Sequence, residues 1–596
     1  MALRTLTVDL ERGLARQQLP ATVERDYLGG RGAIAWLLWH YLPPDTPPLA
    51  ADNLLIFASG PLAGTSAFAT GGFMVGTRSP LTGAIGYSWA QGHWGARLRQ
   101  VGYDVLVVRG QAPDWVYLLI DGDQVRLRPA GHLLGLDTVA TNAALQAELG
   151  ERASVVCLGP AGEADVAYAT MVAEGRYMAE PAGTGAVMAA KHLKAIVIRG
   201  GNPVEAPDPR RLAAAQEVIR RRVETSPIAT AIKQAGTIPL LAHAAGLGAL
   251  TGQNGSVSQP DPALAQAFEQ LAHQPVVSRG CNGCPMPCFH DLKREDGNNL
   301  PRPELETLAG FGARCGISDP EVLATLADRC LRLGLDPVAT SAALAFLMEC
   351  QERGLTHSGK IAWGDADAIL AAIERLGMRQ EKRDVLSLGV GEMQEIFWGS
   401  AVFAPQARGQ AMPALDPRAL NGLALALATA AIGADHRYAM FYEELVATPP
   451  SWLPDEASGP HETRGKALRL IWHERFAAML DTAGVCRRLG IMAYQVSPGE
   501  LLALMMASGA TITAAEMVRI GERIITVERL FARRYADNVG RDDLPARWRD
   551  VPLTEGPAAD HRVPLGELLA EYYRRHGWNA QGDPSPERLA ELGIKV

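Results

Sequence analysis

The chain has 596 residues, which is enough for about three or four domains. Its 47% hydrophobic and 20% charged residues are typical of a globular protein, and its net charge of −8, with no run of Lys or Arg, argues against a nucleic-acid partner. The N-terminus shows no signal-peptide pattern, and the most apolar run, Gly422 to Ala434, is shorter than the roughly 20 residues that cross a membrane. We therefore expect a cytoplasmic protein without a membrane span.

Residues 1–203 are predicted to form strands joined by glycine-rich turns. Trp115–Ile120 and Gln124–Arg128 flank Asp121-Gly122-Asp123, a pattern typical of a β-hairpin. Further short apolar strands are expected at 53–57, 103–108, 154–158 and 193–198. The sequence shows no internal repeat. We interpret this segment as one β-rich domain.

Glycine-rich turns recur in this segment and include Gly92, Gly95, Gly183 and Gly185. Glycine lets backbone N–H groups approach a ligand closely, and successive N–H groups can bind an anion. Simple punctuation of hairpins is the alternative. None of the turns has the strand–helix context of a dinucleotide-binding or phosphate-binding loop. The turns in question are Thr70–Phe73, Arg78–Gly83, Gln91–Gly95 and Gly183–Ala186.

From residue 204 onward the pattern becomes mainly helical, so the fold class is predicted to be α+β. Pro and Gly residues in Ala404–Pro417 suggest a boundary between a helical domain over 204–410 and a second one over 411–596. The long helices are predicted at 210–224, 262–272, 320–333, 341–352 and 466–480.

Three cysteines lie close together in a Cys-x2-Cys-x3-Cys spacing, at Cys281, Cys284 and Cys288. Thiolates suit iron–sulfur clusters and zinc, and a disulfide is disfavoured in a long chain without an export signal. A closed site needs a fourth ligand, which we assign to Cys486 because it follows a helix end. The other cysteines have apolar neighbours typical of a protein core. The spacing favours an iron–sulfur cluster, with zinc and coincidence as alternatives.

The segment Pro303–Leu308 carries two glutamates that are two residues apart. On a helix Glu304 and Glu306 would point roughly 200° apart, so that only one could face a buried site. Glu306 shares its face with small residues, and a carboxylate in an apolar site can exchange protons near neutrality. The alternative is an exposed helix N-terminus that favours acidic residues.

An apolar helix is predicted to end at Gly433 and to be followed by Asp435-His436-Arg437. His436 is a candidate catalytic residue, although an isolated histidine can also be structural. Two other helix ends resemble each other, Leu333–Asp336 and Asp481–Cys486, since each has a glycine as its stop signal. They suggest two halves that hold one pseudo-symmetric ligand, and ordinary helix capping is the alternative.

Taken in order, these motifs resemble the tungsten-containing aldehyde:ferredoxin oxidoreductase family over nearly the whole chain. No single motif is decisive, but the ordered set is specific. It comprises Arg78–Gly83, Val101–Asp104, Gly185–Met188, Lys191–Ile196, Cys281–Cys288, Pro303–Thr307, Leu333–Asp336, Gly433–His436, Asp481–Cys486, Glu571–Tyr573 and Gly577-Trp578.

The resemblance implies a tungsten or molybdenum bis-pyranopterin at the interface of the β-rich and helical domains, beside a [4Fe–4S] cluster. Magnesium commonly bridges the pterin phosphates in this family. By position, the cluster ligands are Cys281, Cys284, Cys288 and Cys486, and the catalytic residues are Glu306 and His436. The implied pterin-binding residues are Arg78, Gly92, Gly95, Gly183, Gly185, Gly334, Leu335, Asp336, Asp481, Gly484 and Val485.

The implied reaction oxidises an aldehyde to a carboxylic acid and sends electrons through the cluster to ferredoxin or to a small iron–sulfur partner subunit. A divergent member that reduces another substrate, such as an aromatic acyl group, is one alternative. A non-catalytic protein that carries only the cluster is another. The resemblance leaves the oligomeric state open, including a homo-oligomer.

Several positions depart from the family pattern. Gly72 stands where the family usually has Arg, Trp89 where it often has Asn, Pro181-Ala182 where it has Arg-Gly, and Leu331 where it has a polar residue. The Glu-x-x-His pair that some members use for a metal between subunits is missing. Loss of cationic side chains weakens the binding of phosphates unless other residues compensate.

Overall fold

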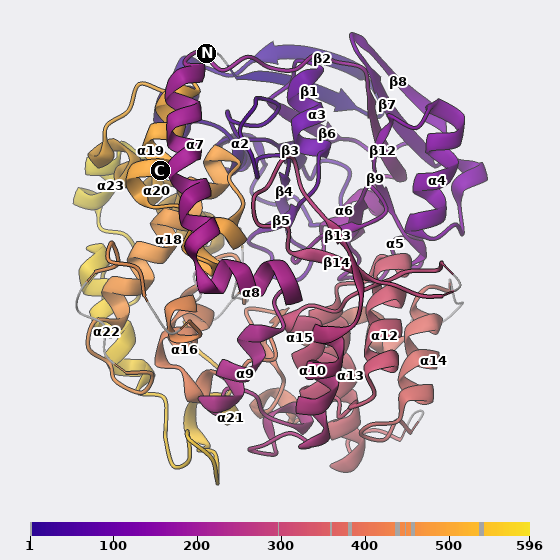
Figure 1. The fold of residues 1–596 in the computed structure, drawn as a ribbon, viewed down its shortest axis with the longest axis vertical. Coiled ribbons are helices and arrows are strands. Elements are labelled where there is room, and N and C mark those ends of the chain that lie inside the picture. The colour runs from indigo at the N-terminus through magenta and orange to yellow at the C-terminus, as the bar shows by residue number, and fades with distance from the viewer. Residues whose placement is uncertain are drawn as a thin grey trace.

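The first 200 residues contain two six-stranded sheets, connected by helices and turns, in this computed structural model (Figure 1). The structure describes residues 3–295, 297–357, 360–378, 384–435, 441–446, 449–454, 459–535 and 542–595. In spatial order the first sheet consists of β2 (Gly13–Gln18), β1 (Arg4–Asp9), β6 (Val105–Arg109), β3 (Leu55–Ala58), β4 (Phe73–Arg78) and β5 (Ile85–Ala90). The second consists of β8 (Gln124–Pro129), β7 (Val116–Asp121), β12 (Leu193–Arg199), β9 (Ser154–Leu158), β10 (Met171–Ala173) and β11 (Tyr177–Ala179).

The two sheets have the same topology. The hairpin β1–β2 corresponds to β7–β8, the parallel pair β1–β6 to β7–β12, and the antiparallel series β6–β3–β4–β5 to β12–β9–β10–β11. The expectation of no internal repeat is therefore wrong at the level of topology. Corresponding strands differ in length, since β4 and β5 have six residues each and β10 and β11 have three, which hides the repeat in the sequence.

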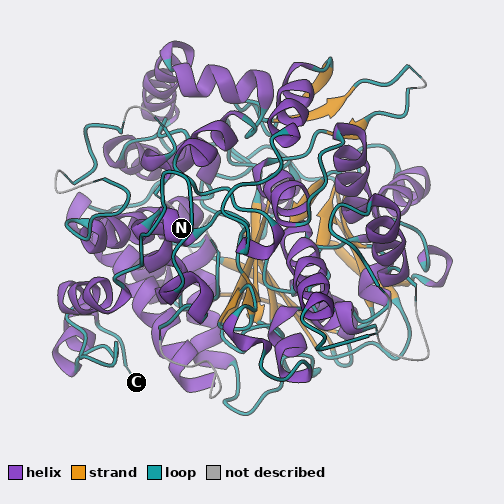
Figure 2. Cartoon of the chain, turned by 90° about the horizontal axis from the view of Figure 1, so that it is seen from below, coloured by secondary structure: helices purple, strands orange, loops and turns teal. Residues whose placement is uncertain are grey.

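The sheets face each other across a core that also contains α3 (Trp94–Gln100) and α6 (Thr184–Ala190), which contact strands of both sheets. Other helices cover their outer faces (Figure 2). Successive side chains of a strand alternate between its faces. In β3, Leu55 and Phe57 therefore belong to the core between the sheets, where the Phe57 ring centre lies 5.6 Å from that of Trp94. Ile56 and Ala58 belong to the core that includes α2 (Gly30–Tyr41). The outer face of the second sheet packs on α4 (Thr138–Leu149).

The remainder of the described chain is mainly helical. A small sheet of β13 (Val276–Arg279), β14 (Phe289–Leu292) and β15 (Leu300–Pro301) interrupts it, and β16 (Gln406–Ala407) pairs with β17 (Gln410–Ala411). Short helices of the first region are α1 (Ala21–Tyr27), α3 (Trp94–Gln100), α5 (Pro160–Glu163) and α6 (Thr184–Ala190). Those that follow are α7 (Pro209–Thr225), α8 (Pro227–Ala235), α9 (Pro239–Gly246), α10 (Ala263–His273), α11 (Leu305–Thr307), α12 (Pro320–Leu333), α13 (Pro337–Glu352), α14 (Ala366–Leu376), α15 (Val390–Ile396), α16 (Asn421–Thr429), α18 (Lys466–Ala483), α19 (Pro498–Ala507), α20 (Ala514–Tyr535), α21 (Ala546–Asp550), α22 (Leu565–His576) and α23 (Pro586–Leu592).

The β-rich N-terminal region and the mainly helical remainder are confirmed. The predicted long helices correspond to α7, α10, α12, α13 and α18, with ends shifted by a few residues. Local signals explain their bounds: in α12 the Asp319 side chain accepts from the N–H groups of Glu321 and Val322, and Gly334 ends the helix in a left-handed conformation. The domain boundaries at 203 and 410 stay predictions.

Two helix ends meet the two sheets at equivalent points of the repeat. Gly60 follows β3 and touches the end of α18, and Gly159 follows β9 and touches the end of α12. A Cβ on Gly60 would lie 2.1 Å from the carbonyl carbon of Ala483, and one on Gly159 would lie 2.3 Å from the carbonyl oxygen of Leu333. Only glycine fits at these contacts, so the backbone of each helix end lies directly against its sheet.

Gly159→Ala is expected to lower the free energy of unfolding by about 1–3 kcal/mol, the usual cost of overpacking, because its methyl group would clash with the backbone of α12. Gly131→Ala is the matched control, because a Cβ there has nothing within 4 Å. The shift of the denaturant midpoint measures both variants. Equal stability of the two variants would contradict close backbone contact at Gly159.

Candidate functional site

The structure brings together all four cysteines predicted to form one site. Cys281, Cys284 and Cys288 lie in the loop between β13 and β14, and Cys486 follows the end of α18. All four line one small cavity. The remaining cysteines are buried in the core and do not line it; they are Cys157, Cys315, Cys330 and Cys350. In the described part of the chain, no three His, Cys, Asp or Glu side chains have the spacing that holds a single metal ion.

The backbone of Ala69 fixes the two cysteine segments relative to each other. Its N–H donates to the carbonyl of Asn282 at 3.1 Å, and its carbonyl accepts from the N–H of Cys486 at 3.0 Å. Within the loop, the N–H of Cys284 donates to the carbonyl of Cys281 at 2.8 Å, and Gly283 takes a positive φ of 67°. Segments about 200 residues apart are thus joined by main-chain hydrogen bonds around the cavity.

The four thiols share a buried environment. Burial raises the pKa values of Cys281 and Cys284 well above the ordinary thiol range, and the neighbouring cysteines add to this effect. Burial raises the pKa of Cys288 to about 11, although the positive charge of Arg488 opposes the rise. Arg488 Nη1 donates to Cys288 Sγ at 3.7 Å. Thiolates would therefore be costly here without a cation between them.

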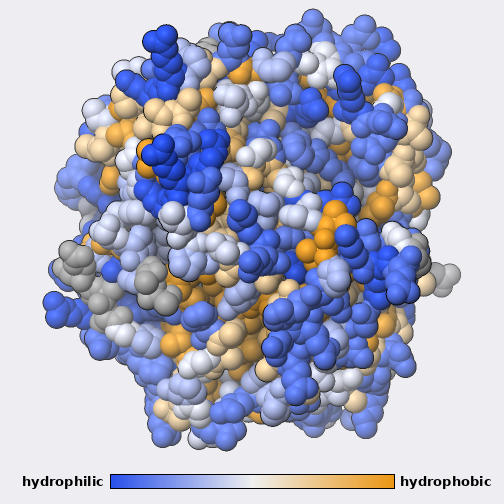
Figure 3. All heavy atoms as spheres, viewed as in Figure 1, coloured by the Kyte–Doolittle hydropathy of each residue, from blue (hydrophilic) through white to orange (hydrophobic). Residues whose placement is uncertain are grey.

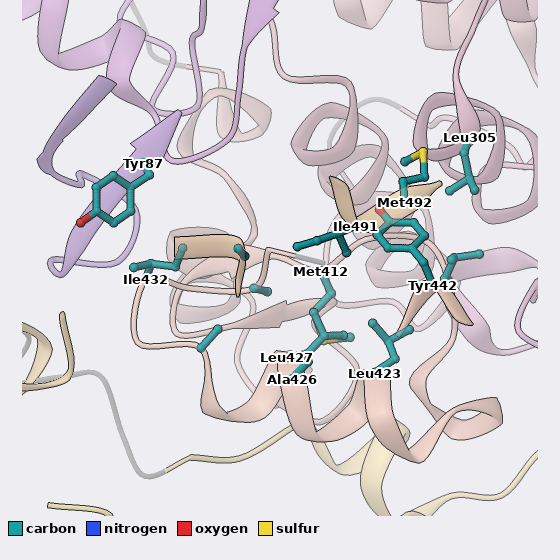
Figure 4. Packing of buried hydrophobic residues seen from close by; sticks show 14 of the residues in the cluster. Tyr87, Leu305, Met412, Leu423, Ala426, Leu427, Ile432, Tyr442, Ile491 and Met492 are labelled. Atoms are coloured by element: carbon teal, nitrogen blue, oxygen red, sulfur yellow. The ribbon is translucent and has the colours of Figure 1, made fainter. Parts of the chain in front are cut away.

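A much larger cavity adjoins the cysteine cavity. The space in it that the centres of water molecules can occupy is about 160 Å³. Gln91, Phe289 and Arg488 line both cavities and form a common wall between them. The β-rich region contributes Trp89 and Glu180, and the helical part contributes residues 301–307 and the turn after Cys486. Four of the apolar residues in its wall lie close together in Figure 4: Leu305, Tyr442, Ile491 and Met492.

Glu304 and Glu306 both line the large cavity, so the prediction that only one could face a buried site is wrong. The helix begins at Leu305, and Glu304 precedes it in an extended conformation (φ −98°, ψ 171°), which removes the 200° separation. Glu304 binds the guanidinium of Arg488 with both carboxylate oxygens. Glu306 Oε2 accepts from the N–H of Ala414 at 3.2 Å.

The predicted catalytic residue His436 lies outside the described residues. Asp435, its neighbour, lines the large cavity and is 7% exposed. Beyond the undescribed residues 436–440, Tyr442 returns to the cavity wall. The short helix η7 (Tyr442–Glu444) is anchored by Glu443, whose Oε2 accepts from the Tyr494 hydroxyl at 2.5 Å and contacts His473 Nε2 at 3.0 Å.

The two helix-end turns predicted to hold pterins flank the site. Gly334 and Gly484 both have a left-handed conformation, with φ of 73° and 78°. The Asp336 side chain caps α13 by accepting from two backbone N–H groups. The Asp481 side chain is fully buried and accepts from Arg31 at 3.1 Å and from Arg487 at 2.5 Å. Neither aspartate lines the large cavity, and neither do Leu335 and Val485; Leu331 and Val338, next to the first turn, do line it.

The remaining predicted pterin-binding residues also lie outside the walls of both cavities. The Arg78 side chain donates to the backbone carbonyls of Thr46, Gly83 and Tyr535. Each predicted glycine closely approaches another part of the chain: a Cβ on Gly95 would lie 2.0 Å from the carbonyl oxygen of Gly72. The same applies to Gly92, Gly183 and Gly185. Close packing therefore accounts for these glycines in the structure, against backbone at Gly95, Gly183 and Gly185 and against side chains at Gly92.

Several residues of the site were missed at the sequence level. Arg487 and Arg488 line the large cavity, and their position directly after Cys486 is the signal that could have identified them. Arg176 and Arg302 also line it, but no local pattern marks them. Trp89 was noted only as a departure from the family; its Nε1 is buried without a hydrogen-bond partner among the described residues.

Comparisons with known proteins assign the chain to a family. The model of the aldehyde ferredoxin oxidoreductase N-terminal domain matches residues 5–200, and that of aldehyde ferredoxin oxidoreductase domains 2 and 3 matches residues 214–594. The chain therefore belongs to the aldehyde ferredoxin oxidoreductase family, and it is an enzyme of this tungstopterin oxidoreductase class.

Individual relatives cover the full chain. The tungsten-containing aldehyde ferredoxin oxidoreductases of Pyrococcus furiosus and Thermococcus kodakarensis are 31% and 30% identical to it, over 99% of this chain and 98% of theirs. The WOR-like subunit of an aliphatic sulfonate oxidoreductase from Pyrococcus furiosus is 25% identical over 99% of this chain and 96% of its own length.

A solved structure has the same fold. It is the active site complex BamBC of benzoyl coenzyme A reductase in complex with 1,5-dienoyl-CoA, one chain of which is 24% identical with a TM-score of 0.81. The match covers 99% of this chain and 96% of that chain. In the described residues, no helix has the length and apolar character to cross a membrane. The face in Figure 3 is largely hydrophilic, with small apolar groups among polar residues.

The Glu443 network predicts an acid-sensitive contribution to stability. Burial opposes ionisation of Glu443, but the charge of His473 and hydrogen bonds from His473 and Tyr494 lower its pKa to about 2, below the ordinary 4.5. The carboxylate therefore stabilises the fold above pH 4.5, and this contribution is lost as the pH falls toward 2. Glu443→Gln is expected to lower the free energy of unfolding by about 3 kcal/mol at pH 7.

The measurement is denaturant unfolding of both proteins at several pH values. The difference in the free energy of unfolding between the native protein and Glu443→Gln should be constant from pH 7 to 5 and shrink below pH 4.5. Glu395→Gln, on an exposed position of α15, is the control and is expected to change stability by less than about 0.5 kcal/mol. A difference that does not depend on pH would contradict an ionised Glu443.

Proposed function

We propose that this protein oxidises aldehydes to carboxylic acids at a tungsten bis-pyranopterin and passes the electrons through a [4Fe–4S] cluster to ferredoxin or to an iron–sulfur partner subunit. The observation that carries the proposal is the pair of adjoining cavities. One is lined by four cysteines, the other contains Glu306, and they share a wall. Membership of the family supports the tungsten pterin, and the family name supports ferredoxin as the acceptor.

The residues of the small cavity fit an iron–sulfur cluster. Cys281, Cys284, Cys288 and Cys486 would each supply a thiolate, the usual ligand of such clusters. Four thiolates in one buried space repel one another, and a cationic iron core would offset this repulsion. The hydrogen bonds of Ala69 would hold the loop and Cys486 at the separation that the cluster requires.

The large cavity fits a bulky ligand that has polar edges. Its wall combines apolar side chains with the charged groups of Arg302, Glu306 and Arg487. The buried Trp89 indole N–H, which has no hydrogen-bond partner among the described residues, could donate to an acceptor on such a ligand. The equivalent helix ends at Gly334 and Gly484 support a ligand with two similar halves, as in a paired pterin with a bridging magnesium ion.

Bound there, the metal pterin would supply two-electron oxidation of the substrate. Glu306 would accept a proton released during turnover, because its carboxylate lies in the wall of the cavity. The resemblance assigns the orientation of the substrate to His436, the residue after Asp435. The apolar side chains of Leu305, Ile491 and Met492 would receive the side chain of the aldehyde and exclude water from Glu306.

The names of two similar proteins define the alternatives. One is an aliphatic sulfonate oxidoreductase subunit, and the other belongs to a benzoyl coenzyme A reductase complex. Oxidation of a panel of aldehydes with a viologen dye as acceptor, compared with reduction of acyl substrates by reduced dye, separates the proposed reaction from a divergent one.

Elemental analysis tests the cofactors directly. The protein purified without oxygen is expected to contain tungsten and about four irons per chain. Cys486→Ser should lose most of the iron, whereas Cys330→Ser, which changes a buried cysteine outside the cavity, should retain it. Iron without tungsten would indicate a non-catalytic cluster carrier. Zinc in place of iron would contradict the proposal.

Glu306→Gln tests the proton acceptor. The substitution keeps the shape of the side chain but removes its basicity, so the rate of aldehyde oxidation should fall by about 10²–10⁴-fold. Tungsten and iron contents should remain those of the native protein. Glu392→Gln, which is exposed on α15 and outside both cavities, is the control. Full activity of Glu306→Gln with both metals present would remove Glu306 from the mechanism.

A further inference from the structure

Arg488 occupies an unusual position between the two cavities. Of the three residues in their common wall, Gln91, Phe289 and Arg488, it is the charged one. It belongs to the π-helical turn η8 (Arg488–Met492), two residues after Cys486. Its side chain is 16% exposed, so its charge acts in a largely dehydrated environment.

The contacts of Arg488 fix the direction of its guanidinium. Glu304 accepts from both terminal nitrogens, with Nη1 at 2.5 Å from Oε1. The guanidinium carbon lies 4.4 Å from the centre of the Phe289 ring, and Nη1 also donates to Cys288 Sγ at 3.7 Å. A guanidinium held by a carboxylate and a ring loses little freedom when it donates to a third group. The contact with sulfur is therefore built into the folded chain.

Gly72 lines neither of the two cavities. Gly72 stands where the family usually has Arg, and a Cβ on Gly72 would lie 3.0 Å from the indole of Trp89. Trp89 itself lines the large cavity. The indole thus occupies the space beside residue 72, and the charged residue that lines both cavities, Arg488, comes from the helical part of the chain.

A donor and a positive charge next to a cluster thiolate favour the reduced cluster, which carries one more negative charge. Hydrogen bonds to sulfur, net charge and solvent exposure are the properties that set the potential of iron–sulfur clusters. Arg488 would act on the potential through its charge and through its hydrogen bond to Cys288. Because Glu304 partly offsets the charge, we expect the hydrogen bond to contribute more.

We propose that Arg488 is a positioning residue that raises the reduction potential of the cluster and thereby favours electron transfer from the large cavity. This inference rests on the proposed function, because it requires a cluster at the four cysteines. Arg488 contacts a cluster ligand and lines the large cavity, so one side chain joins the two sites.

The test is a redox titration of the cluster followed by electron paramagnetic resonance, which does not depend on turnover. Arg488→Met removes the donor and the charge but keeps the length of the side chain, and it should shift the midpoint potential to more negative values. A tenfold change in the ratio of reduced to oxidised cluster corresponds to about 59 mV for a one-electron couple. Arg488→Lys, which retains a charge and a donor, should restore part of the shift.

Two further variants separate this role from a structural one. Glu304→Gln with Arg488→Met leaves no unpaired charge, so it remains measurable if the single variant does not fold, and it should show the same negative shift. Arg329→Met removes a half-exposed arginine of α12 that lines neither cavity and should leave the potential unchanged.

The outcomes distinguish the two proposals. An unchanged potential in Arg488→Met, or in the double variant if the single one does not fold, with about four irons bound, would overturn the role of Arg488 and leave the proposed function intact. A native protein without iron would overturn the proposed cluster and, with it, this inference. A negative shift in the Arg488 variants but not in Arg329→Met would support it.

Discussion

Two hydrogen bonds of a single backbone unit, that of Ala69, define the geometry on which the site depends. One joins the β-rich region to the cysteine loop at Asn282, and the other joins it to Cys486 at the end of α18. Each bond contributes only about 0.5–1.5 kcal/mol, but a buried amide that loses its partner is considerably more costly. The relative placement of the loop and the helix end is therefore strongly constrained. The cysteine cavity and its common wall with the large cavity follow from that placement.

The topological repeat explains why two similar helix ends approach the site from different sides. In each six-stranded unit a glycine follows the corresponding strand, Gly60 after β3 and Gly159 after β9, and each glycine packs against the backbone of a helix end. The strands have diverged in length and sequence, whereas the contact positions have no room for a side chain. A ligand composed of two similar halves would suit such a frame, as we propose for the pterin.

Most of the charged side chains described around the site form ion pairs with each other. These pairs fix the orientation of the side chains in a buried environment. Asp481 is held by Arg31 and Arg487, and Arg31 also binds Glu528 with two hydrogen bonds. Such buried pairs contribute modestly to net stability because dehydration opposes the attraction, yet removal of one partner is costly. The helix end that carries Cys486 is consequently tied to α2 and α20 as well as to Ala69. The same turn places Arg488 at the common wall.

Local patterns in the sequence determined the elements and several ligand candidates. The Cys-x2-Cys-x3-Cys spacing, the glycine stops at 334 and 484, and the hairpin at 115–128 are properties of neighbouring residues, so they can be read without tertiary information. The ordered motifs identified the family correctly. By contrast, the prediction for Glu304 and Glu306 was wrong because it placed both residues on a helix, whereas the helix begins only at Leu305.

Only the tertiary structure decided which distant residues meet. The contact of Arg488 with Cys288 and Glu304 joins positions about 200 residues apart, and no local spacing encodes it. The repeat of the two sheets was hidden for a similar reason, since strand pairing depends on long-range hydrogen bonds rather than on sequence similarity. The sequence thus determined the groups available for chemistry. Packing of the β-rich region against α12 and α18 decided which of them line a common wall, because backbone contacts at Gly60, Gly159 and Ala69 fix those elements in space.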